Sequence, residues 1–276
     1  PTRGKSKFLN SNKTTKFNDR ILQKNETKTG HIYDESRNLE NNTNSNNSEL
    51  NDNGIEYNLS KTIEEIVEWF NSNNAVSAKN KKAFEDEQKI AKAFFNEVGI
   101  ALGKLDSIER IQIFRIYRDV RFSKNKLPYK NHFSAGFTRT KPLLRGGYYL
   151  HIEPGASFIG GGFWEPNPVD LNRIRKEIEL DDEEMRTLIA DKTFKSYFTE
   201  LKGEELKTAP KGFDKTHPAI DLLRKKQYLL TRNFSDKEVL APNFQDEVLK
   251  TFEAMRPFFD YISEVLSTDL NGESIY

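Results

Sequence analysis

Residues 147–163 read GYYLHIEPGASFIGGGF and contain two strand patterns separated by a turn. From Gly147 to Glu153, apolar and polar side chains alternate, which predicts a β-strand with one buried face. The segment Glu153-Pro154-Gly155 interrupts this pattern in the manner of a turn. Residues 156–163 are then expected to run back antiparallel, so the stretch predicts a β-hairpin.

Strand and helix patterns on both sides of this hairpin predict an α+β fold. Further strands are expected at residues 113–122, 133–138 and 228–234. Helical spacing of apolar side chains is found at residues 60–70, 79–102, 168–179, 182–190, 191–201, 218–226 and after Asn243. Helices gathered before and after antiparallel hairpins indicate a mixed or antiparallel sheet packed against N-terminal and C-terminal helices.

The chain of 276 residues divides by composition into two parts. Residues 1–58 are rich in Lys and Asn and have almost no apolar periodicity, so we expect a disordered or unrelated extension. The functional alternative is a basic arm for nucleic acid or a targeting tail. From residue 59 onward aromatic and aliphatic side chains recur steadily, so residues 59–276 are expected to form a single α+β domain.

Composition also excludes several classes of site and protein. The chain has no cysteine, which excludes disulfides and thiolate metal sites. It has no apolar run of about 20 residues and no signal-peptide core. We therefore expect a cytoplasmic protein without a membrane partner. No motif identifies a cofactor.

The region from Ile111 to Gly147 is strongly basic. It carries nine Lys or Arg residues and one acid, Asp119, which gives it a charge of +8 in a chain of net charge +1. Such an imbalance produces a positive potential that attracts phosphates and carboxylates. The nine cations are Arg115, Arg118, Arg121, Lys124, Lys126, Lys130, Arg139, Lys141 and Arg145.

Part of this basic region is a candidate ligand site. Arg115 and Arg121 are expected to flank Asp119 on one face of a strand, where the carboxylate would hold guanidinium groups that fork onto a phosphate or carboxylate. A loop containing Pro128 would add further cations. A structural lattice of ion pairs is the alternative interpretation. The predicted ligand-binding residues are Arg115, Tyr117, Asp119, Arg121, Lys124, Lys126, Tyr129 and Lys130.

The first strand of the hairpin supplies a candidate catalytic pair. Tyr149, His151 and Glu153 are expected to project from one face of it. A histidine beside a carboxylate can act as a general base, so His151 and Glu153 are the predicted catalytic residues. The sequence shows no third ligand, so no metal site is predicted, and a hydrogen-bonded structural histidine is the alternative. The glycines at 160–162 permit a close backbone approach or a tight bend, and they do not form a P-loop.

These segments also resemble a known family. They are FRIYRDVRFSKNKLPYK (114–130), GYYLHIEPG (147–155), FIGGG (158–162), APKGFD (209–214) and SDKE (235–238). Over roughly residues 59–266 the chain is similar to the bacterial and fungal conserved hypothetical proteins called domain of unknown function 2461, a family with specific motifs of this length. Their Trp-Phe helix corresponds to Glu68-Trp69-Phe70 here, and residues 1–58 have no counterpart. The resemblance implies a single α+β domain and no established activity.

Three functional hypotheses follow from these patterns. The preferred one is an enzyme or small-molecule-binding protein for an anionic ligand, such as a phosphorylated metabolite, which Arg115, Arg121 and Lys130 would clamp. The second is a nucleic-acid-binding module in which Tyr117 or Tyr129 stacks on bases. The near-neutral net charge mildly disfavours it. The third is a protein-interaction scaffold whose basic face meets an acidic partner.

Overall fold

The computed structural model describes residues 81–122, 129–269 and 272–276. All of them belong to one compact unit of the chain. The expected extension at 1–58 and the expected helix at 60–70 lie outside the described residues. No helix in the described ranges is long and apolar enough to cross a membrane.

A five-stranded antiparallel sheet is the centre of this unit. Its strands follow each other in space in their chain order. They are β1 (Ile108–Ile113), β2 (Phe133–Arg139), β3 (Gly147–Ile152), β4 (Phe158–Phe163) and β5 (Tyr228–Asn233). The described helices are α3 (Lys81–Gly103), α4 (Pro168–Leu180), α5 (Glu183–Ala190), α6 (Lys192–Phe198), α7 (Ile220–Leu223), α8 (Asp236–Val239) and α9 (Phe244–Ser267). The α+β class expected from the sequence is confirmed.

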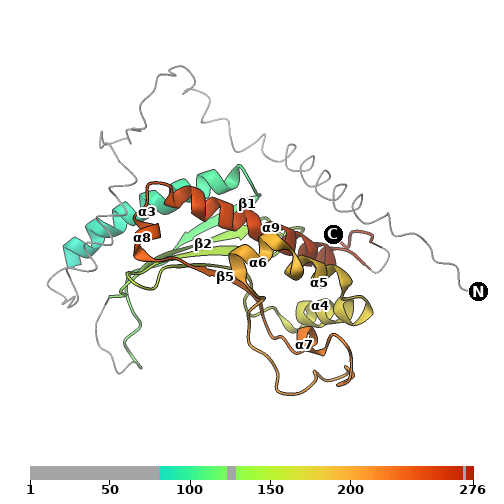
Figure 1. Ribbon diagram of the computed structural model, residues 1–276. Coiled ribbons are helices and arrows are strands. Elements are labelled where there is room, and N and C mark those ends of the chain that lie inside the picture. The colour runs from blue at the N-terminus through green and yellow to red at the C-terminus, as the bar shows by residue number, and fades with distance from the viewer. Residues whose placement is uncertain (1–80, 123–128, 270–271) are drawn as a thin grey trace, which may run out of the picture. The chain divides into compact units, whose positions relative to one another are not determined.

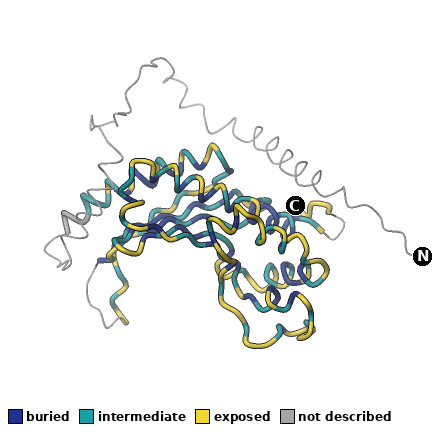
Figure 2. The backbone as a smooth tube through the Cα atoms, viewed as in Figure 1, coloured by how far each residue is buried: buried dark blue, intermediate teal, exposed yellow. Residues whose placement is uncertain are grey.

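Helices α3 and α9 pack on one face of the sheet (Figure 1). The alternation in β3 directs Tyr148, Leu150 and Ile152 into the core beneath them, where each is at most 2 % exposed. Figure 2 shows buried backbone running along the strands and α9 together. The intervening positions of the strands belong to the opposite side of the sheet, which we call the distal face. Its members include Ser134, Gly136, Tyr149, His151, Phe158 and Gly160, and the Phe114 ring, just after β1, packs against Tyr149 there.

The prediction of a strand at residues 113–122 is wrong. β1 ends at Ile113, and the chain then leaves the sheet as an irregular segment that runs beside residues 129–132. The backbone N–H of Lys130 donates to the Ile116 carbonyl at 2.8 Å, and Tyr117 and Tyr129 form an isolated bridge. We call residues 114–122 and 129–132 the arm. The backbone N–H of Phe114 still donates to the Ser134 carbonyl at 2.9 Å, but beyond it only isolated contacts remain, so the alternation does not form a regular strand.

The helical half follows the expectations more closely. α4 begins after Asn167, whose side chain accepts from the backbone N–H groups of Val169 and Asp170. α7 is shorter than the helix expected at 218–226, because Lys226 N donates to the Glu204 carbonyl and so leaves the helical pattern. The short helix α8 was not anticipated.

The glycine run in β4 permits a close approach of neighbouring elements, which is the first of its two expected roles. A Cβ added at Gly161 would lie 2.5 Å from Met255 Sδ of α9. At Gly162, where φ is +128°, a Cβ would lie 2.1 Å from the Tyr228 carbonyl oxygen of β5. Strand β4 can therefore pack against both neighbours only without side chains here.

Candidate functional site

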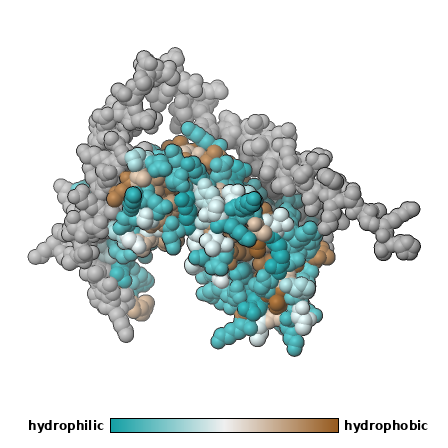
Figure 3. All heavy atoms as spheres, viewed as in Figure 1, coloured by the Kyte–Doolittle hydropathy of each residue, from teal (hydrophilic) through white to brown (hydrophobic). Residues whose placement is uncertain are grey.

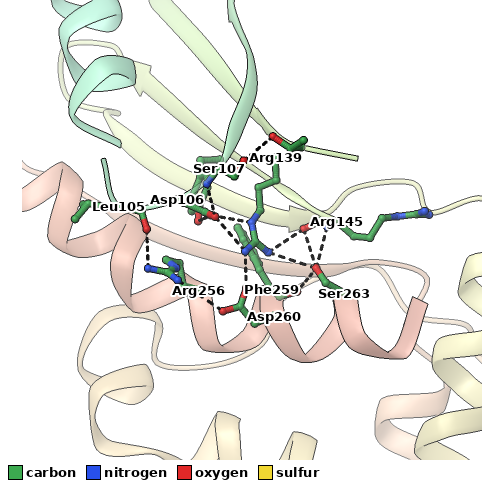
Figure 4. Close-up of polar contacts among 11 residues, drawn as sticks. Leu105, Asp106, Ser107, Arg139, Arg145, Arg256, Phe259, Asp260 and Ser263 are labelled. Atoms are coloured by element: carbon green, nitrogen blue, oxygen red, sulfur yellow. Dashed lines mark hydrogen bonds and ion pairs between the residues drawn. The ribbon is translucent and has the colours of Figure 1, made fainter. Parts of the chain in front are cut away.

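Two of the nine cations of the basic region are held in buried or half-buried ion pairs. Arg139 lies at a core-facing position of β2 and is 1 % exposed. Its Nε is 2.7 Å from Asp106 Oδ2, and its Nη2 bonds Asp260 of α9 (Figure 4). Arg145 pairs with Asp170 at the beginning of α4. These partners neutralise both charges, so Arg139 and Arg145 do not contribute to the positive surface expected from the sequence.

On the arm, Asp119 binds Arg121 but not Arg115. Its Oδ1 accepts from Arg121 Nε at 3.0 Å and its Oδ2 accepts from Arg121 Nη2 at 2.7 Å. The Arg121 hydrogen bond holds the pKa of Asp119 below its usual value. The Nε–Nη2 edge is one with which an arginine forks onto an anion, so Arg121 already uses this edge internally. Of the two arginines expected beside Asp119, Arg115 has no hydrogen bond or ion pair among the described residues.

The arm tyrosines do not form a platform for bases. Tyr129 is 7 % exposed, and its ring centroid lies 5.5 Å from that of Tyr117. The Tyr117 hydroxyl donates to Glu85 Oε1 of α3 at 3.2 Å. These contacts attach the arm to itself and to α3. Two other predicted ligand residues, Lys124 and Lys126, lie outside the described residues.

Three cations gather near the base of the arm. The Lys130 ammonium is 5.9 Å from the centroid of the Phe114 ring. Burial lowers the pKa of Lys130, and the charge of Arg115 lowers it further. Arg118 and Lys130 both act electrostatically on the nearby His132. Within the described ranges, none of Arg115, Arg118 and Lys130 forms an ion pair, and we call these three the cation group.

Strands β2 and β3 place two histidines and a glutamate together. Phe133 pairs with Ile152, so the residue before it, His132, falls opposite Glu153. The ring centroids of His132 and His151 are 4.1 Å apart. Glu153 Oε2 lies 2.8 Å from His151 Nε2 and 4.0 Å from His132 Nδ1. His132, His151 and Glu153 are called the His–Glu cluster below.

Neighbouring side chains orient this cluster. The Tyr149 hydroxyl lies 3.1 Å from His151 Nδ1, on the side of the ring away from Glu153. Asn131 Nδ2 donates to Glu153 Oε1. The Phe158 ring stacks on His151 with a centroid distance of 4.8 Å. His151 and Glu153 are therefore each held by a neighbour that leaves Nε2 and Oε2 directed at one another.

The protonation states follow from this environment. Burial lowers the pKa of His132 to about 4, with His151 and Lys130 adding to the effect. At neutral pH His132 is therefore uncharged and keeps a nitrogen lone pair. Burial also raises the pKa of Tyr149, so its hydroxyl stays protonated. A neutral imidazole, a carboxylate and a hydroxyl in this arrangement can exchange a proton or hold a cation.

Sequence reasoning identified His151 and Glu153 but missed His132. Its signal lies in the register of the hairpin between β2 and β3, which places His132 opposite Glu153. Alternation within a single strand contains no such information. The third group whose absence from the local sequence argued against a metal site is therefore supplied by the arm, at the residue that precedes β2.

The surface around these groups is uneven. Figure 3 shows the molecule hollowed below the sheet, between the arm and the lobe of α4 and α7, with mostly hydrophilic side chains at its rim. A separate hollow of about 550 Å³ lies between α5, α6 and α9 and is lined by residues such as Phe194, Tyr197 and Phe258. None of the site residues expected from the sequence lines that second hollow.

Comparison with known proteins gives a family and no activity. The model of a family described as conserved hypothetical protein, DUF2461, matches residues 67–261. The matched range covers more than half of the chain and includes all five strands, the cation group and the His–Glu cluster. No curated protein matches the chain.

Proposed function

The chain belongs to the DUF2461 family of conserved hypothetical proteins, and from its geometry we propose that it binds an anionic small molecule beside the distal face of the sheet. In this proposal Arg115 and Lys130 contact a phosphate or carboxylate of the ligand. The pair of His151 and Glu153, 2.8 Å apart, exchanges a proton with the bound molecule. The family membership contributes the fold to this proposal and no reaction.

The observation that carries the proposal is the cation group. Arg115, Arg118 and Lys130 lie close enough to influence one another or His132, and no described acid forms an ion pair with them. Holding like charges together is unfavourable, and an anion from outside relieves that repulsion. Bound phosphate would therefore be stabilised by interactions that the ligand-free protein lacks.

The relay of side chains on β3 supports the proton-transfer role. The Tyr149 hydroxyl, the His151 imidazole and the Glu153 carboxylate are connected by distances of 3.1 Å and 2.8 Å. A histidine oriented by a second group on its far nitrogen is a common arrangement for general acid–base catalysis. The same relay would serve a purely structural purpose if no ligand approached it.

Nucleic-acid binding is supported less well. Tyr129, one of the two rings expected to stack on bases, is buried. Phe122 does fit this alternative, because its ring is 95 % exposed and lies 5.9 Å from the guanidinium carbon of Arg121. An oligonucleotide therefore belongs in the experiment beside small anions.

The test is calorimetric titration of the full chain with pyrophosphate, a sugar phosphate and a short single-stranded oligonucleotide, all with a metal chelator present. The double variant Arg115→Met/Lys130→Met should bind the small anion roughly tenfold to a hundredfold more weakly for each cation removed, because charge-assisted hydrogen bonds contribute about 1.5–3 kcal/mol each. The matched control is Lys104→Met/Lys141→Met, which removes the same charge from two exposed lysines outside the cation group.

Equal weakening in the test and control variants would mean that net charge, and not the cation group, attracts the anion. Binding of the oligonucleotide alone, with an affinity that falls steeply as salt is added, would favour the nucleic-acid alternative. The absence of binding by every anion tested would reject the proposal.

A further inference from the structure

We propose that His132, His151 and Glu153 bind one divalent transition-metal ion of the Zn²⁺ or Fe²⁺ class. One ligand atom from each of these residues lies within 4.8 Å of the other two. Two imidazole nitrogens with one carboxylate oxygen form a donor set that suits these metals and leaves coordination positions open. Hard ions such as Mg²⁺ and Ca²⁺ prefer oxygen ligands, so they fit the set less well.

The distances in the cluster are close to those that a metal requires. Ligand atoms about 2.0–2.2 Å from a metal, at tetrahedral angles, lie roughly 3.3–3.6 Å from one another. Glu153 Oε2 is 2.8 Å from His151 Nε2 and 4.0 Å from His132 Nδ1, on either side of this range, and all three ligand atoms lie within 4.8 Å of one another. Rotation of the side chains that shifts each ligand atom by about an ångström would bring the three atoms around one ion. No backbone movement is needed, because β2 and β3 already place His132 opposite Glu153.

The surrounding hydrogen bonds resemble those that support metal ligands. A ligating histidine usually uses its other nitrogen for a hydrogen bond that fixes the ring. For His151 that contact is Tyr149, whose hydroxyl can either donate to Nδ1 or accept from it. Glu153 Oε1 is occupied by Asn131, which leaves Oε2 for the metal. The Glu153 backbone N–H also donates to Ser157 Oγ at 3.0 Å, which holds this end of β3 in place.

The cation group affects the ion in two ways. Lys130 and Arg118 disfavour positive charge at His132, so they weaken the binding of the metal ion. The same cations favour an anionic ligand at the open coordination positions. This second effect rests on the anion binding proposed above, whereas the metal site itself rests only on His132, His151 and Glu153. With the ion bound, His151 and Glu153 hold the metal and no longer exchange a proton with the ligand.

The test uses the full chain, freed of metal by dialysis against a chelator and then titrated with Zn²⁺ alone, without any added anion. Co²⁺ serves as a spectroscopic substitute, because its visible absorption reports nitrogen ligands and low coordination number. We expect one ion per chain. His132→Gln and Glu153→Gln should each weaken binding by more than Tyr149→Phe, which should weaken it roughly tenfold to a hundredfold through loss of the His151 contact.

The matched control is His217→Asn. His217 lies outside the cluster, where its Nδ1 accepts from the backbone N–H of Ala219, and an asparagine oxygen can replace that acceptor. This variant should bind Zn²⁺ as the parent does. His132 is only partly buried and Glu153→Gln keeps the size of the side chain, so both test variants are expected to fold. Chemical unfolding without metal checks this for each of them.

Three results would overturn the inference. The parent could bind Zn²⁺ no more tightly than His132→Gln and Glu153→Gln do. The His217→Asn control could lose as much affinity as the cluster variants, which would indicate adventitious surface binding. Co²⁺ could bind without visible absorption that depends on His132. Because no anion is added, each of these results leaves the pyrophosphate titration of Arg115 and Lys130 as a separate question.

Discussion

Arg139 and the cation group come from the same basic region of the sequence but lie in opposite electrostatic environments. Arg139, at a core-facing position of β2, is paired with Asp106 and Asp260. Arg115 and Lys130 lie on the arm, and neither has an ion pair among the described residues. A count of positive charges along the chain treats all three alike.

The difference between the two regions follows from burial. A buried guanidinium is tolerated only where carboxylates and other acceptors replace its water, and for Arg139 these include Asp106, Asp260 and Ser263 (Figure 4). A cation on the arm keeps contact with water and needs no internal partner. Arg139 is thus expected to matter for stability, and the cation group for binding.

Among the variants that test this comparison, Arg139→Met is expected to lower the free energy of unfolding the most. The substitution leaves the Asp106 carboxylate buried without a cation and leaves Asp260 only Arg256 at 4.0 Å, and breaking a buried ion pair in this way costs about 3–5 kcal/mol. The free energy of unfolding in urea measures it.

The control on the arm is Arg115→Met, which should change the free energy of unfolding by less than about 0.5 kcal/mol because Arg115 is exposed. Similar losses for Arg139→Met and Arg115→Met would contradict the division into a structural and a binding region.

A smaller loss of stability is expected from replacing Tyr148 or Tyr149, two adjacent tyrosines that point to opposite faces of β3. Tyr148 donates to Asp106 inside the core, so Tyr148→Phe removes a donor from a buried carboxylate and should cost about 1–3 kcal/mol. Tyr149→Phe, on the distal face, should cost less, because Tyr149 is only partly buried. Parallel unfolding curves of the two variants compare these costs.

The Tyr148 prediction also has a pH dependence. Burial, followed by the Asp106 charge, raises the pKa of Tyr148 well above its usual value of 10.0. The folded state therefore holds this proton more tightly than the unfolded state does. The resulting stabilisation is complete below pH 10 and is lost as the pH rises above it, so the difference between parent and Tyr148→Phe should narrow there. A constant difference across this range would contradict the burial of the hydroxyl.

The smallest loss of stability is expected from replacing Gly160 or Gly161, two adjacent glycines of β4, by alanine. A Cβ at Gly161 would lie 2.5 Å from Met255 Sδ and 2.9 Å from the Phe259 ring, so Gly161→Ala should destabilise the fold. Met255 is flexible, which places the cost near the lower end of the ~1–3 kcal/mol typical of overpacking. At Gly160, on the distal face, the nearest atom would be 3.6 Å away, so Gly160→Ala should stay within about 1 kcal/mol of the parent. Thermal melts that rank Gly160→Ala as the more harmful change would reverse the assignment of the two faces.

Local patterns predicted much of this fold. The expected bounds of α3, α4, α9 and the hairpin of β3 and β4 are close to the observed ones. Apolar periodicity predicts such elements because it depends only on which side chains of one helix or strand face the core. The strand at 113–122 was wrong for a different reason. Alternation is present along that segment, but a strand exists only where a neighbour pairs with it, and β2 pairs with residues 108–113.

The candidate site divides in the same way. His151 and Glu153 lie two residues apart on one strand, so their proximity was contained in the local sequence. His132 joins them only through the pairing of β2 with β3. Asp119 pairs with Arg121, and Arg115 has no ion pair among the described residues. Both facts likewise depend on how side chains are placed in an irregular segment.

The sequence by itself determined the α+β class, the main helices, the hairpin and the pair of His151 and Glu153, because each of these depends on residues that are neighbours along the chain. Only the tertiary structure decided that Arg139 is buried between Asp106 and Asp260, that His132 completes the His–Glu cluster, and that Arg115 and Lys130 lack internal ion-pair partners within the described residues. The physical reason is that charge compensation and ligand geometry depend on distances in space. Those distances are established by strand register and helix packing between residues far apart in the chain.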